Sequence, residues 1–345
     1  MISLLPLYKA RQNLAQFVAY YIWEGEIFFI SLHHESKRTN NKRCNQPSIN
    51  MKTIKVLTIL VVELLLGLQL MAQTNTVFKL TKEEGHFYFK ASLNGVETDI
   101  WLESGVPGLI LSEAFYNEHK DSFQMEVKET KGKMRFLKGT YNIKYTAQAR
   151  LRIGDAIFEG TVMVLEGDHK TMVPINMLRH QDDNSAIVKL NLPDYELSVC
   201  SREAMKDLVN KSTALDISFN HWGMPVVTTK LSMDVEQRKL NMEGNFIIDM
   251  GNGSLLFLNK NHENVANMLK YGMVNLKPAY DKKGNVVSEG LFANKLTVCG
   301  KSYKNVSVGV TSHAKALQAC GYLGLKFFVM PVVFDFDNQK MYLCK

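Results

Sequence analysis

The stretch Trp101–Leu111 reads WLESGVPGLIL, and the stretch Ile247–Phe257 reads IIDMGNGSLLF. Each runs from two apolar residues to an acid, one intervening residue and a glycine, and each ends on three apolar residues. The second copy starts 146 positions after the first, and at the same offset Gly154 corresponds to Gly300. Two copies are too few for a solenoid, so the repeat predicts a duplicated domain.

Most of the chain around the repeat has the pattern of β-strands. Short apolar segments are bounded by Gly, Asn and Asp, which predicts strands at Val77–Leu80, Phe87–Ala91, Ala147–Ile153, Thr161–Leu165 and Val306–Val310. A helical pattern is confined to Ser112–Phe123, Arg202–Asn210 and Lys260–Tyr271. We therefore predict an all-β fold. It would have two homologous lobes, residues 73–205 and 206–345, a central cleft and a few short helices.

Each copy of the repeat carries a carboxylate at the end of an apolar strand, two residues before a glycine. These acids are Glu103, before Gly105, and Asp249, before Gly251. If a pseudo-two-fold axis relates the lobes, the two turns meet and the carboxylates face each other. Two adjacent carboxylates cannot both ionise easily, so one keeps a proton. Such a pair can activate water and protonate a leaving group without a metal or another cofactor, and we expect neither here.

This pattern resembles the pepsin and retropepsin family of aspartic proteases. The resemblance rests on both acid-x-Gly turns, on the later element Gly321–Phe328 (GYLGLKFF), and on Val333–Phe336 (VFDF). It covers nearly all of residues 77–345. It implies a cleft that holds a peptide or an unfolded protein segment under a flap. The flap would run from Lys138 to Tyr145 with a hinge at Gly139, and Tyr141 or Tyr145 would be its tyrosine.

Three residues depart from the pattern of that family, whose turn is Asp-Thr-Gly or Asp-Ser-Gly. Glu103 is one methylene longer than Asp, and a displacement of that size can lower a rate about 10²-fold. Ser104 can supply one half of the family's cross-lobe hydroxyl clamp, but Met250 cannot supply the other. In Val173–Leu178 we expect Asn176 to replace the glycine of the downstream element. Asp249 is therefore the better-placed acid–base residue.

Two functions remain open. The first is an exported peptide hydrolase of the aspartic type that uses Glu103 and Asp249. The second is a peptide-binding protein that has lost catalysis. A third reading, in which lobe two alone forms half of a symmetric dimer, is weakened by Met250, and we expect a monomer.

Export is predicted by residues 51–72, MKTIKVLTILVVELLLGLQLMA, which resemble a signal peptide cleaved after Ala72. Residues 1–50 then read as a mispredicted extension, and a periplasmic or secreted protein without a membrane anchor is expected. Residues 73–345 hold 33 basic and 30 acidic residues, a net charge too small to indicate nucleic-acid binding. Their four cysteines (Cys200, Cys299, Cys320 and Cys344) allow three disulfide pairings or remain as buried thiols.

The mature protein is expected to begin at Gln73. N-terminal sequencing of the exported protein tests this, because a signal peptide acts only at the start of the translated chain. Recovery of any of residues 1–50 in the mature protein would contradict it.

Overall fold

The structure is a computed structural model of the 345-residue chain that describes residues 75–136, 139–280, 284, 286–312 and 318–344. The chain divides into two units, Met1–Leu64 and Leu65–Lys345, and the described residues all lie in the second. The predicted extension and signal peptide lie outside them. No helix among the described residues is long and apolar enough to cross a membrane.

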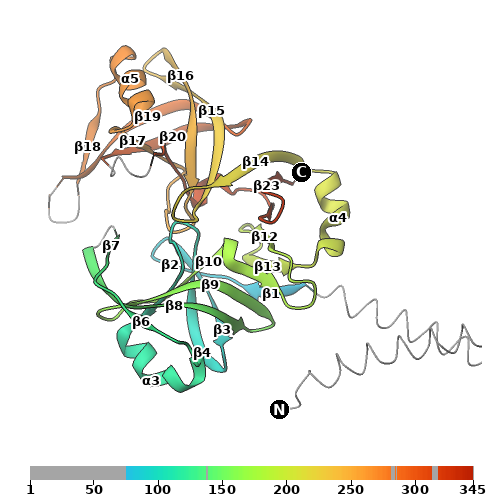
Figure 1. Ribbon diagram of the computed structural model, residues 1–345. Helices are drawn as coiled ribbons and strands as arrows, with labels where there is room; N and C mark the ends of the chain where they lie inside the picture. The colour runs from blue at the N-terminus through green and yellow to red at the C-terminus, as the bar shows by residue number, and fades with distance from the viewer. Residues whose placement is uncertain (1–74, 137–138, 281–283, 285, 313–317, 345) are drawn as a thin grey trace, which may run out of the picture. The chain divides into compact units, whose positions relative to one another are not determined.

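Strands dominate the fold, which confirms the predicted all-β class with two related lobes (Figure 1). The strands of lobe one form one ten-stranded sheet that closes on itself where β8 pairs with β9. They are β2 (Thr81–Glu83), β3 (His86–Leu93), β4 (Val96–Glu103), β5 (Leu109–Ser112), β6 (Lys128–Glu129), β7 (Lys133–Phe136), β8 (Gly139–Ile153), β9 (Ala156–Leu165), β10 (Thr171–Pro174) and β11 (Leu178–His180).

Lobe two repeats this arrangement with a second set of strands. They are β15 (Pro225–Val235), β16 (Arg238–Ile248), β17 (Leu256–Asn259), β18 (Lys277–Tyr280), β19 (Val286–Val298), β20 (Lys301–Thr311) and β21 (Gly321–Leu323). In lobe one, β10 runs parallel to β4 and antiparallel to β5. In lobe two, β21 runs parallel to β16 and antiparallel to β17. The two copies of the sequence repeat therefore fold into the same order of strands.

A six-stranded segment of sheet joins the lobes, in the order β1-β13-β12-β22-β23-β14. Each lobe contributes three of these strands: β1 (Thr76–Lys79), β12 (Ile187–Asn191) and β13 (Glu196–Cys200) come from lobe one, and β14 (Thr213–Phe219), β22 (Val332–Asp335) and β23 (Lys340–Leu343) from lobe two. The central pair is antiparallel, with Val188 opposite Phe334. Continuous backbone hydrogen bonding across the lobes holds them in a fixed relation.

In the described part of the chain, three α-helices cover the sheets, close to their predicted bounds: α3 (Glu113–Phe123), α4 (Arg202–Asn210) and α5 (Glu263–Tyr271). The Ser112 and Ser201 hydroxyls cap α3 and α4. Helix α5 starts three residues later than predicted, because the Asn259 side chain accepts from the Asn261 N–H and His262 becomes the N-cap. The predicted lobe boundary after Met205 falls inside α4.

One large apolar cluster runs through both lobes and the shared sheet. It contains Leu102 of β4, Val188 of β12, Ile248 of β16 and Phe334 of β22, each at most 2% exposed. Burial on this scale, at roughly 25 cal/mol per Å² of apolar surface, is the main favourable term for the fold. The four cysteines are buried as free thiols within the described chain, so no disulfide contributes there.

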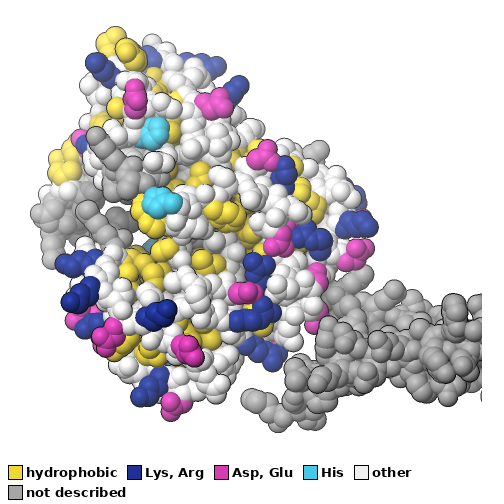
Figure 2. All heavy atoms as spheres, in the orientation of Figure 1, with side chains coloured by type: hydrophobic (Ala, Val, Ile, Leu, Met, Phe, Trp, Pro, Cys, Tyr) yellow, Lys and Arg dark blue, Asp and Glu magenta, His cyan; other side chains and the backbone are white. Residues whose placement is uncertain are grey.

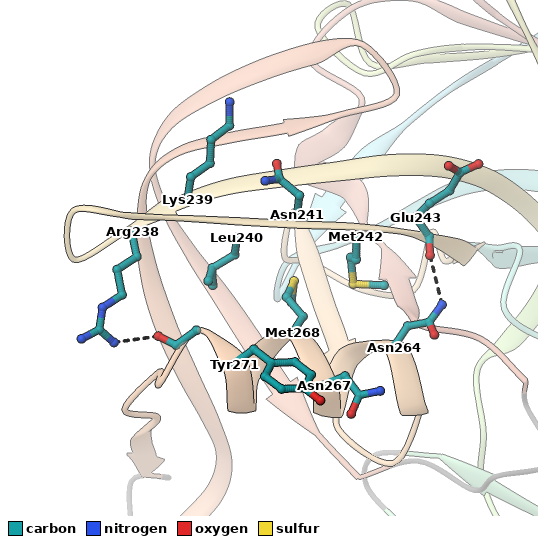
Figure 3. A pocket seen from close by; sticks show the side chains of 11 residues that line it. Arg238, Lys239, Leu240, Asn241, Met242, Glu243, Asn264, Asn267, Met268 and Tyr271 are labelled. Atoms are coloured by element: carbon teal, nitrogen blue, oxygen red, sulfur yellow. Dashed lines mark hydrogen bonds between the residues drawn. The ribbon is translucent and has the colours of Figure 1, made fainter.

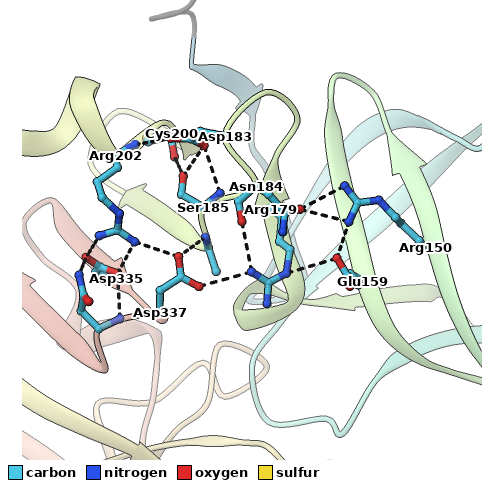
Figure 4. Close-up of polar contacts among 12 residues, drawn as sticks. Arg150, Glu159, Arg179, Asp183, Asn184, Ser185, Cys200, Arg202, Asp335 and Asp337 are labelled. Atoms are coloured by element: carbon cyan, nitrogen blue, oxygen red, sulfur yellow. Dashed lines mark hydrogen bonds and ion pairs between the residues drawn. The ribbon is translucent and has the colours of Figure 1, made fainter. Parts of the chain in front are cut away.

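A polar network ties the hairpin of β22 and β23 to lobe one (Figure 4). The Arg202 guanidinium donates to Asp335 at 2.7 Å and to Asp337 at 2.9 Å. Asp337 also accepts from the Ala186 N–H at 2.9 Å, and Arg179 lies 3.4 Å from it. Asp335 is almost fully buried, so Arg202 compensates a carboxylate that would otherwise lose its hydration.

Candidate active site

Glu103 is the last residue of β4 and Asp249 directly follows β16, and both side chains point away from the apolar core. Along β4, Ile100 and Leu102 are buried, whereas Trp101 and Glu103 keep part of their surface exposed. Along β16, Ile248 is buried and the next residue, Asp249, is partly exposed. Because side chains alternate along a strand, each acid emerges on the face opposite the apolar core residue that precedes it.

The structure brings Glu103 and Asp249 together at the junction of the lobes. A side-chain carbon on Gly105 would lie 2.8 Å from Oδ1 of Asp249, and one on Gly251 would overlap both carboxylate oxygens of Glu103. Each glycine therefore makes room for the acid of the opposite lobe. The Gly251 N–H also donates to Asp249 Oδ1 at 3.1 Å. The two turns are related by the pseudo-two-fold arrangement that the repeat suggests.

Ser104 links the two turns through its buried hydroxyl. Its Oγ donates to the Ile248 carbonyl at 2.7 Å and accepts from the Met250 N–H at 2.9 Å. These hydrogen bonds hold the backbone on both sides of Asp249 against lobe one. The Asp249 N–H donates to the Leu323 carbonyl at 2.9 Å, which ties the same turn to β21.

Met250 occupies the position that corresponds to Ser104 in lobe two. Its side chain is fully buried in the main apolar cluster and offers no hydroxyl. The hydroxyl clamp is therefore one-sided: Ser104 of lobe one holds the turn of lobe two, whereas Met250 supplies no hydroxyl in return, and the Gly251 N–H donates to the Glu103 carboxylate instead. Met is a flexible filler of irregular space, which suits this position.

The pKa values of both acids lie above their ordinary values of 4.5 and 3.8. Burial is the larger cause for Glu103, and the negative charge of Asp249 raises its pKa further. Burial likewise raises the pKa of Asp249, and the hydrogen bond from Gly251 partly opposes this. Both pKa values are raised because two adjacent buried carboxylates cannot both ionise easily, so the pair keeps one proton between them.

Tyr322 is a further site residue that sequence reasoning did not single out. It lies on β21 directly opposite Ile247, two residues before Asp249. Burial and the charge of Asp249 both raise the pKa of its phenol. The sequence did offer one indication of Tyr322, which is its position in the Gly321–Phe328 element. The next residue is Leu323, whose carbonyl accepts from the Asp249 N–H.

The flap segment is a hairpin of β7 and β8, and Lys138 lies outside the described residues. Tyr141 lies on this hairpin opposite Met134, and its ring meets His169 edge-on at 4.1 Å. Tyr145 instead packs on Tyr116 of α3, with ring centroids 5.9 Å apart, at the edge of the lobe-one core. Tyr141 therefore lies on the paired hairpin itself and Tyr145 farther along β8, and the role of either as the flap tyrosine stays a prediction.

The expectation for Asn176 also needs correction. Val173 pairs with Leu102 as Leu323 pairs with Ile248, so Pro174 corresponds to Gly324. The short 3-10 helices that follow, Ile175–Met177 and Leu325–Phe327, agree with this register. Asn176 sits two residues later and donates to the Gly223 carbonyl at 2.9 Å, a contact between the lobes.

Two hollows lie on the described surface, and only one adjoins the site. The first, of about 650 Å³, lies between α5 and β16, where Asn264 donates to the Glu243 carbonyl (Figure 3). It contains no residue of either acid turn. The second, of about 670 Å³, is lined by Gly253 of the Asp249 turn together with Phe87 and Phe328. Among the described residues, no three His, Cys, Asp or Glu side chains cluster as metal ligands would.

Comparison with known proteins finds structural similarity alone. No family model matches the sequence, and no curated protein matches it. An aspartic proteinase from Irpex lacteus is 10% identical, with a TM-score of 0.49 over 79% of this chain and 97% of that one. Basic 7S globulin from soybean is 9% identical, with a TM-score of 0.46 over 79% of this chain and 95% of that one. Such low similarity carries no information about activity.

Replacing Ser104 by Ala should lower the free energy of unfolding by about 1–3 kcal/mol, because the buried Met250 N–H loses its acceptor. Urea unfolding measures the change, and Ser218→Ala on the exposed face of β14 is the matched control. Equal stability of the two variants would show that the clamp contributes nothing.

Replacing Glu103 by Gln should make stability less dependent on pH. Above pH 4.5 the unfolded chain releases the Glu103 proton while the folded protein keeps it, so the free energy of unfolding falls as pH rises toward the raised pKa. In Glu103→Gln this fall in the free energy of unfolding is absent. Urea unfolding between pH 4 and pH 8 should therefore show a shallower decline than in the wild type, and an identical decline would refute the raised pKa.

Proposed function

We propose that this protein hydrolyses peptide bonds with Glu103 and Asp249 as a water-activating acid pair. The observation that supports this most directly is the meeting of two symmetry-related turns, each with a glycine against the acid of the other lobe. Two carboxyl groups with raised pKa values and one shared proton are suited to general acid–base chemistry. No cofactor is needed for this reaction.

The contacts of Asp249 suggest how the two roles are divided. Asp249, whose turn is held by Ser104 and whose carboxylate accepts from the Gly251 N–H, would remove a proton from a water molecule between the carboxyl groups. Glu103, protonated, would donate its proton to the carbonyl oxygen of the peptide as the water oxygen attacks the carbon. Asp249 would then deliver its proton to the leaving nitrogen while the ionised Glu103 takes back a proton from one hydroxyl of the tetrahedral intermediate, and the C–N bond would break to give a carboxyl group and an amine. Water is consumed, and the two product termini carry its atoms.

The substrate of this reaction would be an extended peptide or unfolded segment. The hairpin of β7 and β8 would act as the flap, with Tyr141 as its aromatic residue. We further propose that the protein is exported after cleavage of residues 51–72 and acts as a periplasmic or secreted monomer, free of nucleic acid and membrane.

A second function is favoured by one specific observation. Met250 leaves the clamp one-sided, and Glu103 is longer than the family's aspartate, so the pair could be displaced from the geometry that hydrolysis requires. The protein would then bind extended peptides by strand addition and side-chain pockets without cleaving them.

Cleavage by the purified protein of a diverse peptide mixture, read by mass spectrometry from pH 3 to pH 8, separates these functions. The hydrolase predicts products from the wild type and none from Asp249→Asn, because Asn cannot accept the proton of water. Asp207→Asn on the exposed side of α4 is the matched control and should cleave like the wild type.

Products from Asp249→Asn at the wild-type rate would reject the mechanism. Binding of peptides without any products would favour the second function.

A further inference from the structure

The positive charge of the protein is concentrated in one segment. Residues 131–144, KGKMRFLKGTYNIK, contain five basic residues and no acid. Without them, residues 73–345 hold 28 basic and 30 acidic residues. This segment contains most of the hairpin of β7 and β8, so an otherwise slightly acidic protein carries a strongly basic hairpin.

The hairpin lies beside the acid pair. Met134, Phe136, Tyr141 and Ile143 pack on a cluster that contains Val106, which follows the Glu103 turn directly. The apolar face of the hairpin is thus directed at the lobe, and its basic residues occupy the alternate positions. Figure 1 shows β7 at the edge of lobe one nearest to β18, and in Figure 2 Lys and Arg side chains gather along that edge.

Two described lysines of this segment carry uncompensated charge. Lys131 and Lys133 are exposed, and neither forms an ion pair with a described residue. Lys144 does form an ion pair among the described residues, with Glu166 at 3.7 Å. Exposed charges without partners are available to attract a ligand of opposite sign.

A further cation, Lys170, lies on the wall that carries Glu103. Its ammonium stands 5.8 Å from the centre of the Trp101 ring. Trp101 is two residues before Glu103 on β4, so the two side chains share one face of the strand. Tyr88 and His86 stack beside the same ring, at 6.1 and 5.2 Å. In lobe two, Ile247 takes the position of Trp101 and is buried in an apolar cluster with Met224 and Val226.

We infer that the substrate is an acidic peptide, recognised on the lobe-one side of the acid pair by Lys131, Lys133 and Lys170. This inference rests on the proposed function and deepens it. Lysines at the hairpin raise the local concentration of an anionic chain, and electrostatic steering of this kind changes association rates by about 10- to 1000-fold. Lys170 would pair with a Glu or Asp side chain close to the scissile bond.

Matched peptide pairs test the inference. Peptides that the full-length protein cleaves are resynthesised with Glu replaced by Gln, and kcat/KM is measured at low and at high salt. If the protein binds without cleaving, Kd replaces kcat/KM. Acidic peptides should be preferred about tenfold or more at low salt, and the preference should shrink in 0.5 M NaCl because salt screens exposed charges.

Two variants connect the preference to the named residues. The double variant Lys131→Glu/Lys133→Glu and the single variant Lys170→Glu should each lose most of the preference for acidic peptides while still cleaving the Gln peptides. The control is Lys206→Glu/Lys211→Glu, with one exposed lysine in the middle of α4 and one at its C-cap. It changes the net charge by the same amount as the Lys131→Glu/Lys133→Glu variant and should keep the preference. All these lysines are exposed, so circular dichroism should show the same fold throughout.

Equal cleavage or binding of Glu and Gln peptides, or a preference that survives both lysine variants, would overturn the inference and leave the proposed function intact. Failure of the folded protein to cleave or bind any peptide would instead reject the proposed function, and this inference with it.

Discussion

Two carboxyl groups held close together at the junction of the lobes are the constraint on which the rest of this structure depends. Glu103 and Asp249 repel each other when both are ionised, and burial raises their pKa values further. A fold that keeps them together must supply stability elsewhere. Here it comes from the core that runs through both lobes and from the shared sheet, where β12 and β22 pair across the lobes.

The support beneath the acids is uneven, and this unevenness has a chemical consequence. Ser104 holds the Asp249 turn with two hydrogen bonds, whereas the buried Met250 offers no hydroxyl to the Glu103 turn. Because Ser104 and Gly251 fix the position of Asp249, we assign Asp249 as the base and Glu103 as the acid. The lobes also differ two residues before each acid, where lobe one has Trp101 with the Lys170 ammonium over its ring and lobe two has the buried Ile247.

Much of this fold follows from the sequence because a duplicated pattern must bury equivalent residues in equivalent strands. The two acid-x-Gly turns identify β4 and β16 and bring the acids together once a two-fold relation is assumed. The register of β10 was missed, since apolar periodicity is unchanged by a two-residue shift between Pro174 and Asn176. Tyr141 and Tyr145 fit the same strand pattern in the sequence, so the sequence alone does not separate their positions. In the structure, the contact of Tyr145 with Tyr116 of α3 distinguishes the two. The start of α5 depended on the side-chain bonds of Asn259 and His262, which compete with helix formation.

The central claim is that Glu103 and Asp249 titrate as one coupled pair. Carbon-13 NMR of the two side-chain carboxyl groups, recorded from pH 3 to pH 9 in the wild type and in Asp249→Asn, tests it directly. Both carboxyl groups should titrate above 4.5 and 3.8, and the pKa of Glu103 should fall when Asp249 loses its charge. Titration of both groups at their ordinary values, with Glu103 unaffected by Asp249→Asn, would contradict the account.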